Sequence, residues 1–315
     1  MDWLEITINT KSDEIERLCD KLDELGVGGV IIEDEAEYAA FLENNRRYWD
    51  YVDDELLESW KGLSRVKFYL EDSPDGRAEL ERIRRELPDE TLLSAHVRDE
   101  DWENNWKEFY KPVEVGKKLI IVPQWEEAPE SRGRTVLRLD PGLIFGTGTH
   151  PTTKMCLEAL ESTVKGGERV LDLGCGSGIL AIAALLLGAG SVKGCDIDPK
   201  APDIAMENAA LNGIYGDRFE ALYGDILSDS ALQESFGREK YNIITANIVA
   251  DVIIAACRHA FSWLAPDGTF ICSGIIGARA DEVKTALLTC GFTVERELED
   301  SDWYCYVCTK GYAAQ

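Results

Sequence analysis

The chain has 315 residues, of which 45% are apolar and 29% are charged, so it is long enough for two ordinary domains with a charged surface. We expect no membrane span, because the longest uncharged apolar stretch, residues 179–190, is shorter than the roughly 20 residues that a bilayer requires. The acidic residues 1–5 lack the basic and then apolar order of a signal peptide. The composition therefore predicts a soluble, cytoplasmic protein.

The net charge is −26, from 59 acidic and 33 basic residues. Because phosphate backbones select lysine and arginine, we expect no direct binding to nucleic acid. An acidic surface would attract a basic partner. Acidity that only aids solubility explains the charge equally well, so the charge alone does not decide between these two interpretations.

The nine cysteines are odd in number and follow no framework spacing, which is typical of a reducing cytosol. Cys305 and Cys308 form the only C-x-x-C motif, inside a strand-like run. No second pair is present to complete a zinc site, so we expect no metal.

The first hundred residues show two helical patterns among four strand-like runs. Apolar and polar residues alternate over residues 3–9, and an apolar pattern of helical spacing follows, with Ser12 or Asp13 as its cap. A second helix opens at Pro74 and ends at Pro88. The other strands are predicted at residues 29–33, 65–70 and 92–97. The order β-α-β-β-α-β predicts a ferredoxin-like α+β domain.

Two segments interrupt this regular pattern. An acidic, aromatic insertion occupies residues 34–62. Further along, Trp102, Trp106 and Phe109 fall on one face of a short helix that Pro112 ends. This helix either docks its aromatic side chains onto a core or forms a connector that sets the angle between domains.

After strand-like runs at residues 118–122 and 135–139, strands alternate with helices from residue 169 onward. We predict strands at residues 170–173, 191–196, 219–223, 241–247 and 269–273. We predict helices at residues 179–187, 200–211, 250–264 and 278–290. A closing hairpin is expected at residues 292–298 and 303–309. This alternation predicts a parallel sheet covered on both faces, which is an α/β fold.

A glycine-rich turn joins the first strand of this pattern to its helix. Asp172 precedes Gly174, Gly176 and Gly178, and such glycines permit a tight turn and a close approach of backbone to ligand. A dinucleotide-binding motif would place its last glycine at residue 179, where this chain has Ile179. The G-x-G-x-G form after an acid resembles motif I of class I S-adenosylmethionine methyltransferases.

Three more acids follow later strands. Asp196 ends a strand where a carboxylate can accept hydrogen bonds from both ribose hydroxyls, and we prefer it to Asp198, which suits a helix cap. Asp225 follows the next strand. It either accepts the amino group of an adenine or forms a turn.

Asn247 ends the fourth strand, at the edge where open α/β sheets bind ligands. Its amide oxygen is expected to hold an amine hydrogen and aim the nitrogen lone pair at a methyl group. The alternative is a buried asparagine that anchors a loop. Residues 139–153, rich in glycine and hydroxyl side chains, are expected to face a ligand and cap the next helix, or to form a structural turn. We assign His150 a positional role rather than that of a general base.

The chain as a whole resembles the bacterial ribosomal protein L-eleven methyltransferases of the PrmA type. The stretches that carry the resemblance are residues 145–153, 171–184, 195–199 and 246–248, together with 101–112 outside the catalytic half. The resemblance implies that Thr153, Gly174, Asp196 and Asn247 contact S-adenosylmethionine.

The same resemblance implies a division of the chain into three parts. Residues 1–100 would form a ferredoxin-like substrate-recognition domain, residues 101–115 a linker helix, and residues 116–315 a Rossmann-like methyltransferase domain with a seven-stranded, mostly parallel sheet. The implied substrate is a basic ribosomal protein, L-eleven of the large subunit, which the family methylates on lysines and on its N-terminal amine.

Three rival interpretations remain. A methyltransferase that acts on RNA, DNA or a small molecule shares the cofactor motifs, although the charge of −26 disfavours a nucleic-acid substrate. A non-catalytic ribosome-assembly factor would have no evident need for the glycine loop, Asp196 and Asn247 together. A nicotinamide dehydrogenase is disfavoured by Ile179.

Overall fold

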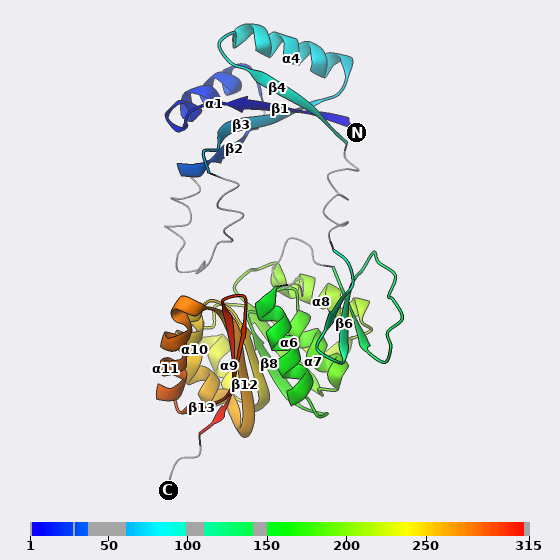
Figure 1. Cartoon of the computed structure of the whole chain (residues 1–315), viewed down its shortest axis with the longest axis vertical. Coiled ribbons are helices and arrows are strands. Elements are labelled where there is room, and N and C mark those ends of the chain that lie inside the picture. Colours follow the sequence, from blue (N-terminus) through cyan, green and yellow to red (C-terminus); the bar gives the residue numbers. More distant parts are fainter. Residues whose placement is uncertain (1, 28, 37–60, 99–109, 141–149, 312–315) are drawn as a thin grey trace. The chain divides into compact units, whose positions relative to one another are not determined.

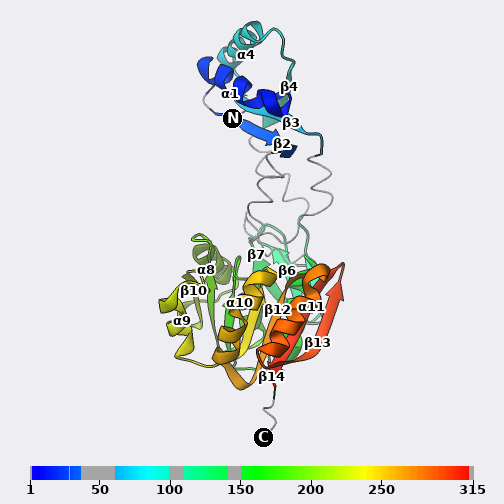
Figure 2. The same cartoon turned by 90° about the vertical axis from the view of Figure 1, so that its left-hand side faces the viewer.

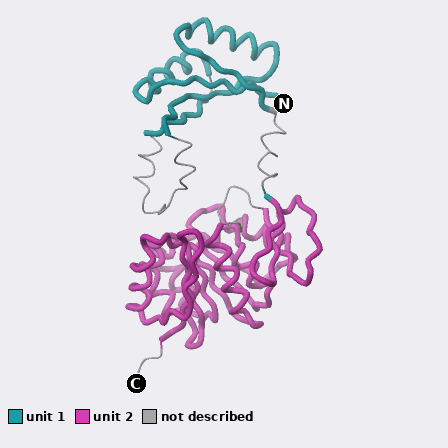
Figure 3. Tube along the Cα trace, viewed as in Figure 1, with its two compact units in different colours: residues 1–110 teal, residues 111–315 magenta. Residues whose placement is uncertain are grey.

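The computed structural model describes residues 2–27, 29–36, 61–98, 110–140 and 150–311. The chain divides into two compact units, residues 1–110 and 111–315 (Figure 3). The predicted linker helix and most of the predicted acidic insertion lie outside the described residues. Within the range 101–115 that we assigned to the linker, Val113–Val115 form strand β5, which pairs with β6 of the second unit.

The first unit is a four-stranded antiparallel sheet with helices on one face (Figure 1). Its elements in chain order are β1 (Asp2–Asn9), α1 (Ile15–Glu24), β2 (Ile31–Asp34), β3 (Ser64–Glu71), α4 (Pro74–Glu86) and β4 (Leu92–Arg98). The strand order β2-β3-β1-β4 is that of a ferredoxin-like sandwich, so the predicted architecture of this part is confirmed.

Alternation along β1 explains how the first unit buries its core. Ile6 and Ile8 point to the helical face, where they pack with Leu22 of α1 and Ile83 of α4. Ser73 caps α4, because its hydroxyl oxygen accepts a hydrogen bond from the Gly76 amide at 3.2 Å.

The predicted cap of α1 is wrong. The helix starts at Ile15, and neither Ser12 nor Asp13 caps it; both lie in a short 3₁₀ turn, Ser12–Glu14. The Ser12 hydroxyl instead donates to Asp34 Oδ1 at 2.7 Å, at the end of β2. The Ser12 hydroxyl therefore bonds a residue distant in sequence instead of an amide in the first turn of α1.

The second unit contains a large and a small sheet. The large sheet has the order β10-β9-β8-β11-β12-β14-β13, in which β14 runs antiparallel to both of its neighbours. Its strands are β8 (Arg169–Leu173), β9 (Ser191–Asp196), β10 (Phe219–Tyr223), β11 (Tyr241–Asn247), β12 (Leu264–Ile276), β13 (Phe292–Asp300) and β14 (Trp303–Lys310). The small sheet consists of β5, β6 (Leu119–Pro123) and β7 (Thr135–Leu139).

Helices cover both faces of the large sheet, as the alternating pattern predicts. One core contains α6 (Pro151–Thr163), α7 (Ile179–Leu187), α8 (Ala201–Leu211) and the small sheet. The other contains α9 (Ser230–Gly237), α10 (Ala250–Trp263) and α11 (Gly277–Thr289), of which α10 and α11 lie side by side in Figure 2. Within β8, Val170 belongs to the first core and Leu171 to the second, because successive side chains point to opposite faces.

Most strand and helix bounds of the second unit fall within a residue or two of the predicted ones. The strand β5, the helix α9 and the length of β12, expected only at residues 269–273, were not predicted. Helix α6 begins at Pro151, inside the segment 139–153 predicted as a loop. Helix α9 buries only Leu232 and Phe236, too few positions to show a helical period.

The strand order places a topological switch point between β8 and β11. From β8 the chain proceeds to β9 and β10 on one side, and β11 continues to β12 on the other. Crevices at the carboxyl ends of strands at such a point bind ligands in open α/β sheets. The residues that end β8, β9 and β11 are therefore candidates for a functional site.

Candidate functional site

The glycine turn after β8 has the backbone conformation that its sequence predicts. Gly174 has φ of 72°, and a Cβ atom there would lie 2.2 Å from Cγ2 of Ile248, which follows β11. Gly178 has φ of 79°, and its added Cβ would lie 3.0 Å from Cβ of Ala205. Only glycine fits both the dihedral angles and the close approach, so the turn presents bare backbone at the switch point.

Asp196 at the end of β9 is joined directly to this turn. Its Oδ2 accepts a hydrogen bond from the Gly176 amide at 2.8 Å, and its Oδ1 accepts one from the Asp198 amide at 2.9 Å. Each carboxylate oxygen retains acceptor capacity beyond these bonds. Asp198 in turn accepts from the Lys200 amide at 2.9 Å, but Lys200 is the N-cap of α8 and no side chain caps the helix, so the capping role considered for Asp198 is wrong.

Asp225 follows β10 at the same edge of the sheet. Its Oδ1 accepts from the Leu227 amide at 2.9 Å and its Oδ2 from the Ser228 hydroxyl at 2.8 Å. Both oxygens therefore stabilise the local turn, which was one of the two interpretations of this residue. The adenine contact remains a prediction.

Asn247 at the end of β11 contacts Thr153 across a long stretch of sequence. Its Nδ2 donates to Thr153 Oγ1 at 3.3 Å, and Thr153 is fully buried in the first turn of α6. The Asn247 Oδ1 atom is buried and accepts no hydrogen bond from any described residue. A buried acceptor without a donor costs free energy, so this oxygen is suited to receive a donor from a ligand.

Asp172 is a second buried acceptor two residues before the glycine turn. Its Oδ1 accepts from the Thr245 hydroxyl at 2.6 Å, whereas Oδ2 has no hydrogen-bond partner within the described part of the chain. Burial raises the pKa of Asp172 to about 7, an effect that the Thr245 hydroxyl and the backbone of Ala181 only partly oppose. The carboxyl therefore lies near its titration point at neutral pH.

His150 occupies the cap position of α6. Its Nδ1 lies 2.8 Å from Thr152 Oγ1 and accepts from the Thr152 amide at 3.4 Å, and its ring packs edge-on against Trp303 at 4.9 Å between centroids. These contacts support the positional role predicted for it. The preceding residues 141–149, part of the predicted ligand-facing loop, lie outside the described residues.

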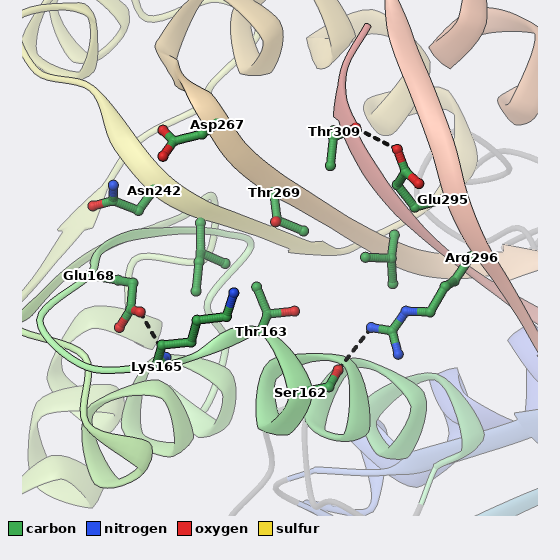
Figure 4. A pocket seen from close by; sticks show the side chains of 12 residues that line it. Ser162, Thr163, Lys165, Glu168, Asn242, Asp267, Thr269, Glu295, Arg296 and Thr309 are labelled. Carbon is green, nitrogen blue, oxygen red and sulfur yellow. Dashed lines mark hydrogen bonds between the residues drawn. The ribbon is translucent and has the colours of Figure 1, made fainter.

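A separate cavity of about 430 Å³ lies away from these carboxyl ends, near the start of strand β11 (Figure 4). Asn242 at the start of β11 lines it, together with Lys165, Asp267 and Arg296. Five residues of strand, roughly 16 Å, separate Asn242 from Asn247. No predicted site residue lines this cavity, so we place the candidate site at the carboxyl ends of the strands.

Sequence reasoning missed two residues at the site. Thr245, which donates to Asp172, and Asn208 of α8, which bonds the glycine turn, are both buried and polar. Their polarity at otherwise apolar positions was a visible signal. Their partners lie 73 and 31 residues away in sequence, so only the fold identifies them.

The described residues also bear on membrane and metal binding. No helix among them is long and apolar enough to cross a membrane. They contain no group of three or more histidine, cysteine or acidic side chains placed to hold a metal ion.

Comparison with known proteins agrees with this arrangement. A sequence model of the family described as ribosomal protein L11 methyltransferase (PrmA) matches residues 2–311. The ribosomal protein L11 methyltransferases of Exiguobacterium sp. and Desulforamulus reducens are 37% and 38% identical, over 99% and 98% of this chain and 100% and 99% of their own lengths. A crystal structure described as ribosomal protein L11 methylase, from Lactobacillus delbrueckii subsp. bulgaricus, is 34% identical with a TM-score of 0.58, and covers 64% of this chain and 100% of that one.

These matches confirm the resemblance predicted from the motifs, and the sheet order confirms the predicted α/β fold class with a smaller α+β domain before it. The chain therefore belongs to the family of ribosomal protein L11 methyltransferases.

Proposed function

We propose that this protein transfers methyl groups from S-adenosylmethionine to amino groups of ribosomal protein L11, on lysine side chains and on the N-terminus. The observation that carries the proposal is the buried, unpartnered Oδ1 of Asn247 beside the glycine turn, in a chain of this family. The proposed substrate is a ribosomal protein, and we accordingly propose a cytoplasmic location.

The residues at the switch point fit S-adenosylmethionine. The turn exposes backbone without side chains at Gly174 and Gly178, where an added Cβ would collide with Ile248 or crowd Ala205, and Asp196 offers carboxylate oxygens for ribose hydroxyls. The unpartnered acceptors of Asp172 and Asn247 suit a ligand that carries amino donors and positive charge. We propose Thr153, Gly176 and Asp225 as further cofactor residues.

S-adenosylmethionine would supply a methyl group that is already activated, so the protein chiefly needs to align the acceptor. Asn247 Oδ1 would accept a hydrogen from the incoming amine and direct the nitrogen lone pair. Thr153 would hold the Asn247 amide in the required orientation through the bond from Nδ2. Alignment of this kind can contribute on the order of 7–11 kcal/mol to lowering the barrier. The amine must be neutral, and desolvation in the site would favour loss of its proton.

The acidic composition supports a protein partner over nucleic acid. At a net charge of −26, this chain attracts basic proteins and repels phosphate backbones at long range. We propose ribosomal protein L11 as the partner and expect no direct contact with RNA or with a membrane.

Mass spectrometry of purified, unmethylated ribosomal protein L11 after incubation with the enzyme and S-adenosylmethionine tests the proposal. We expect mass steps of one methyl group, with fragmentation placing them on lysines and on the N-terminal amine. Ribosomal RNA assayed in parallel is expected to remain unmodified. Methyl transfer to RNA, or cofactor binding with neither substrate modified, would refute the proposed substrate.

A further inference from the structure

Asn208 of α8 and Asn212, the residue that caps the C-terminus of this helix, bond strand β7 and the residue that follows it. Asn212 Oδ1 accepts from the Arg138 amide at 2.7 Å, and its Nδ2 donates to the Arg138 carbonyl at 2.7 Å. One helical turn earlier, Asn208 Oδ1 accepts from the Asp140 amide at 2.8 Å. Among the described strands β7 pairs only with β6. The side-chain amides of Asn208 and Asn212 therefore hydrogen-bond the backbone on its other side, as a neighbouring strand would.

Asn208 makes one further bond that Asn212 does not. Its Nδ2 donates to the Ser177 carbonyl at 2.9 Å, in the middle of the glycine turn. Asn208 is 1% exposed and Ser177 is fully buried, so this hydrogen bond is shielded from solvent. The bonds from Asn212 go to Arg138 and to the Asn208 carbonyl, within the described residues.

Helix α8 also contacts the glycine turn through its apolar surface. Ala205 lies three residues before Asn208, on the same face of the helix, and its Cβ limits the space at Gly178 to 3.0 Å. On the other side of the turn, Asp196 accepts from the Gly176 amide at 2.8 Å. The turn is therefore fixed from two sides, by Asp196 and by Asn208.

We propose that Asn208 is a positioning residue for the cofactor: it holds the glycine turn against β7 in the shape that binds S-adenosylmethionine. Without the Asn208 donor, the buried Ser177 carbonyl lacks this partner and the turn can shift toward one. Binding of S-adenosylmethionine would then have to restore the shape of the turn, which lowers the affinity. The inference rests on the proposed function, because it requires S-adenosylmethionine as the ligand.

Calorimetric titration of the full-length protein with S-adenosylmethionine tests the proposal, with Asn212→Ala as the matched control for Asn208→Ala. Both variants lose bonds to β7, and we expect both to lower the melting temperature. We expect Asn208→Ala to raise the Kd for S-adenosylmethionine about tenfold, the loss of roughly one buried hydrogen bond. Asn212→Ala is expected to change it by less than about twofold.

A second variant separates the acceptor of the Asn208 side chain from its donor. Asn208→Asp keeps an acceptor for the Asp140 amide but removes the Nδ2 donor, which bonds the Ser177 carbonyl at 2.9 Å and, more weakly, the Asp140 carbonyl at 3.5 Å. We expect it to weaken binding at least as much as Asn208→Ala does. In turnover assays both variants are expected to raise the KM for S-adenosylmethionine, with kcat at saturating cofactor nearly unchanged.

An unchanged Kd in a folded Asn208 variant would overturn the inference, as would equal weakening by Asn212→Ala. If Asn208→Ala does not fold, Asn208→Asp provides the same comparison with Asn212→Asp. The wild-type titration keeps the two proposals apart. No binding by the wild type would contradict the proposed function itself, whereas binding without methyl transfer to ribosomal protein L11 would leave the inference on Asn208 standing.

Discussion

Asn247 joins two properties that a residue aligning an amine requires. Its Nδ2 is held by Thr153, and its Oδ1 is buried without a donor among the described residues. We expect Asn247→Ala to lower kcat by about 10²- to 10³-fold, since loss of one preorganised polar group at a reacting centre costs about this much. The Kd for S-adenosylmethionine should change far less. Steady-state kinetics and calorimetric titration measure the two effects.

Asn242→Ala is the control for this variant, because it alters the same residue type at the opposite end of β11. Its side chain accepts a hydrogen bond from the Arg169 amide and lines the separate cavity. We expect its kcat to stay close to that of the wild type. A normal kcat in Asn247→Ala would remove the role assigned to Asn247.

The buried carboxyl of Asp172 predicts a dependence of stability on pH. Burial raises its pKa from the ordinary value of 3.8 to about 7, so the folded state retains a proton that the unfolded chain releases between these values. The stabilisation is complete below about pH 4 and is lost as the pH rises through about 7. Its size is about 4 kcal/mol, at about 1.4 kcal/mol for each unit of pKa difference.

Asp172→Asn should remove this dependence, because an amide keeps an acceptor for the Thr245 hydroxyl and has no proton to lose. Urea unfolding at about pH 5 and about pH 8 would measure the free energy of unfolding of both proteins. We expect the wild type to lose more stability over this interval than the variant. Contributions from the many other acids cancel in the comparison, so equal losses would contradict a raised pKa of Asp172.

At the scale of elements, the glycine turn is the part whose backbone most constrains the sequence. Gly174→Ala would strain a backbone with φ of 72° and place a methyl group against Ile248. We expect a loss of about 1–2 kcal/mol of stability from the left-handed conformation, and a rise of at least about tenfold in the Kd for S-adenosylmethionine. Denaturant unfolding and calorimetric titration measure these effects.

Gly213→Ala is the control for Gly174→Ala, because it separates the effect of backbone strain from the effect of crowding by the added methyl group. Gly213, after α8, has φ of 68°, and an added Cβ would meet no described atom within 4 Å. This variant should lose similar stability through the backbone while binding S-adenosylmethionine normally. If both variants weakened binding equally, the crowding at Gly174 would have no special role.

The elements of the second unit were largely predictable because their signals are local. Strand β11 and helix α7 match the predicted ranges, since each is a compact apolar run between polar or glycine boundaries. Strand β12 extends well beyond its predicted range because Leu264 pairs with β11, and Ile275 and Ile276 pair with β14. Helix α9 was not predicted because its two buried side chains, Leu232 and Phe236, are too few to show a helical period in the sequence.

At the scale of the whole molecule, the charge of −26 predicts how the enzyme meets its substrate. Long-range attraction to a basic ribosomal protein weakens as salt screens it, over roughly 10 Å at 0.1 M. We expect the KM for ribosomal protein L11 to rise severalfold between about 0.05 M and about 0.3 M salt. Initial rates at saturating S-adenosylmethionine measure this change.

The KM for S-adenosylmethionine in the same salt series is the control, because this small ligand is expected to bind in a buried site that salt screens less. A KM for ribosomal protein L11 that does not respond to salt would show that the acidic surface serves solubility alone. That was the second interpretation of the composition.

The sequence by itself determined the elements and the chemistry available at their ends. A strand, three glycines and a helix follow one another within residues 169–187, and Asp196 and Asn247 each end a strand. These signals lie within short windows, where side-chain period and backbone freedom act directly. The tertiary structure alone decided which distant groups meet. Asn247 contacts Thr153 across 94 residues, and Asp172 accepts a hydrogen bond from Thr245 of the neighbouring strand. Asn208 joins the end of β7 to the glycine turn. Strand order and helix packing set these contacts.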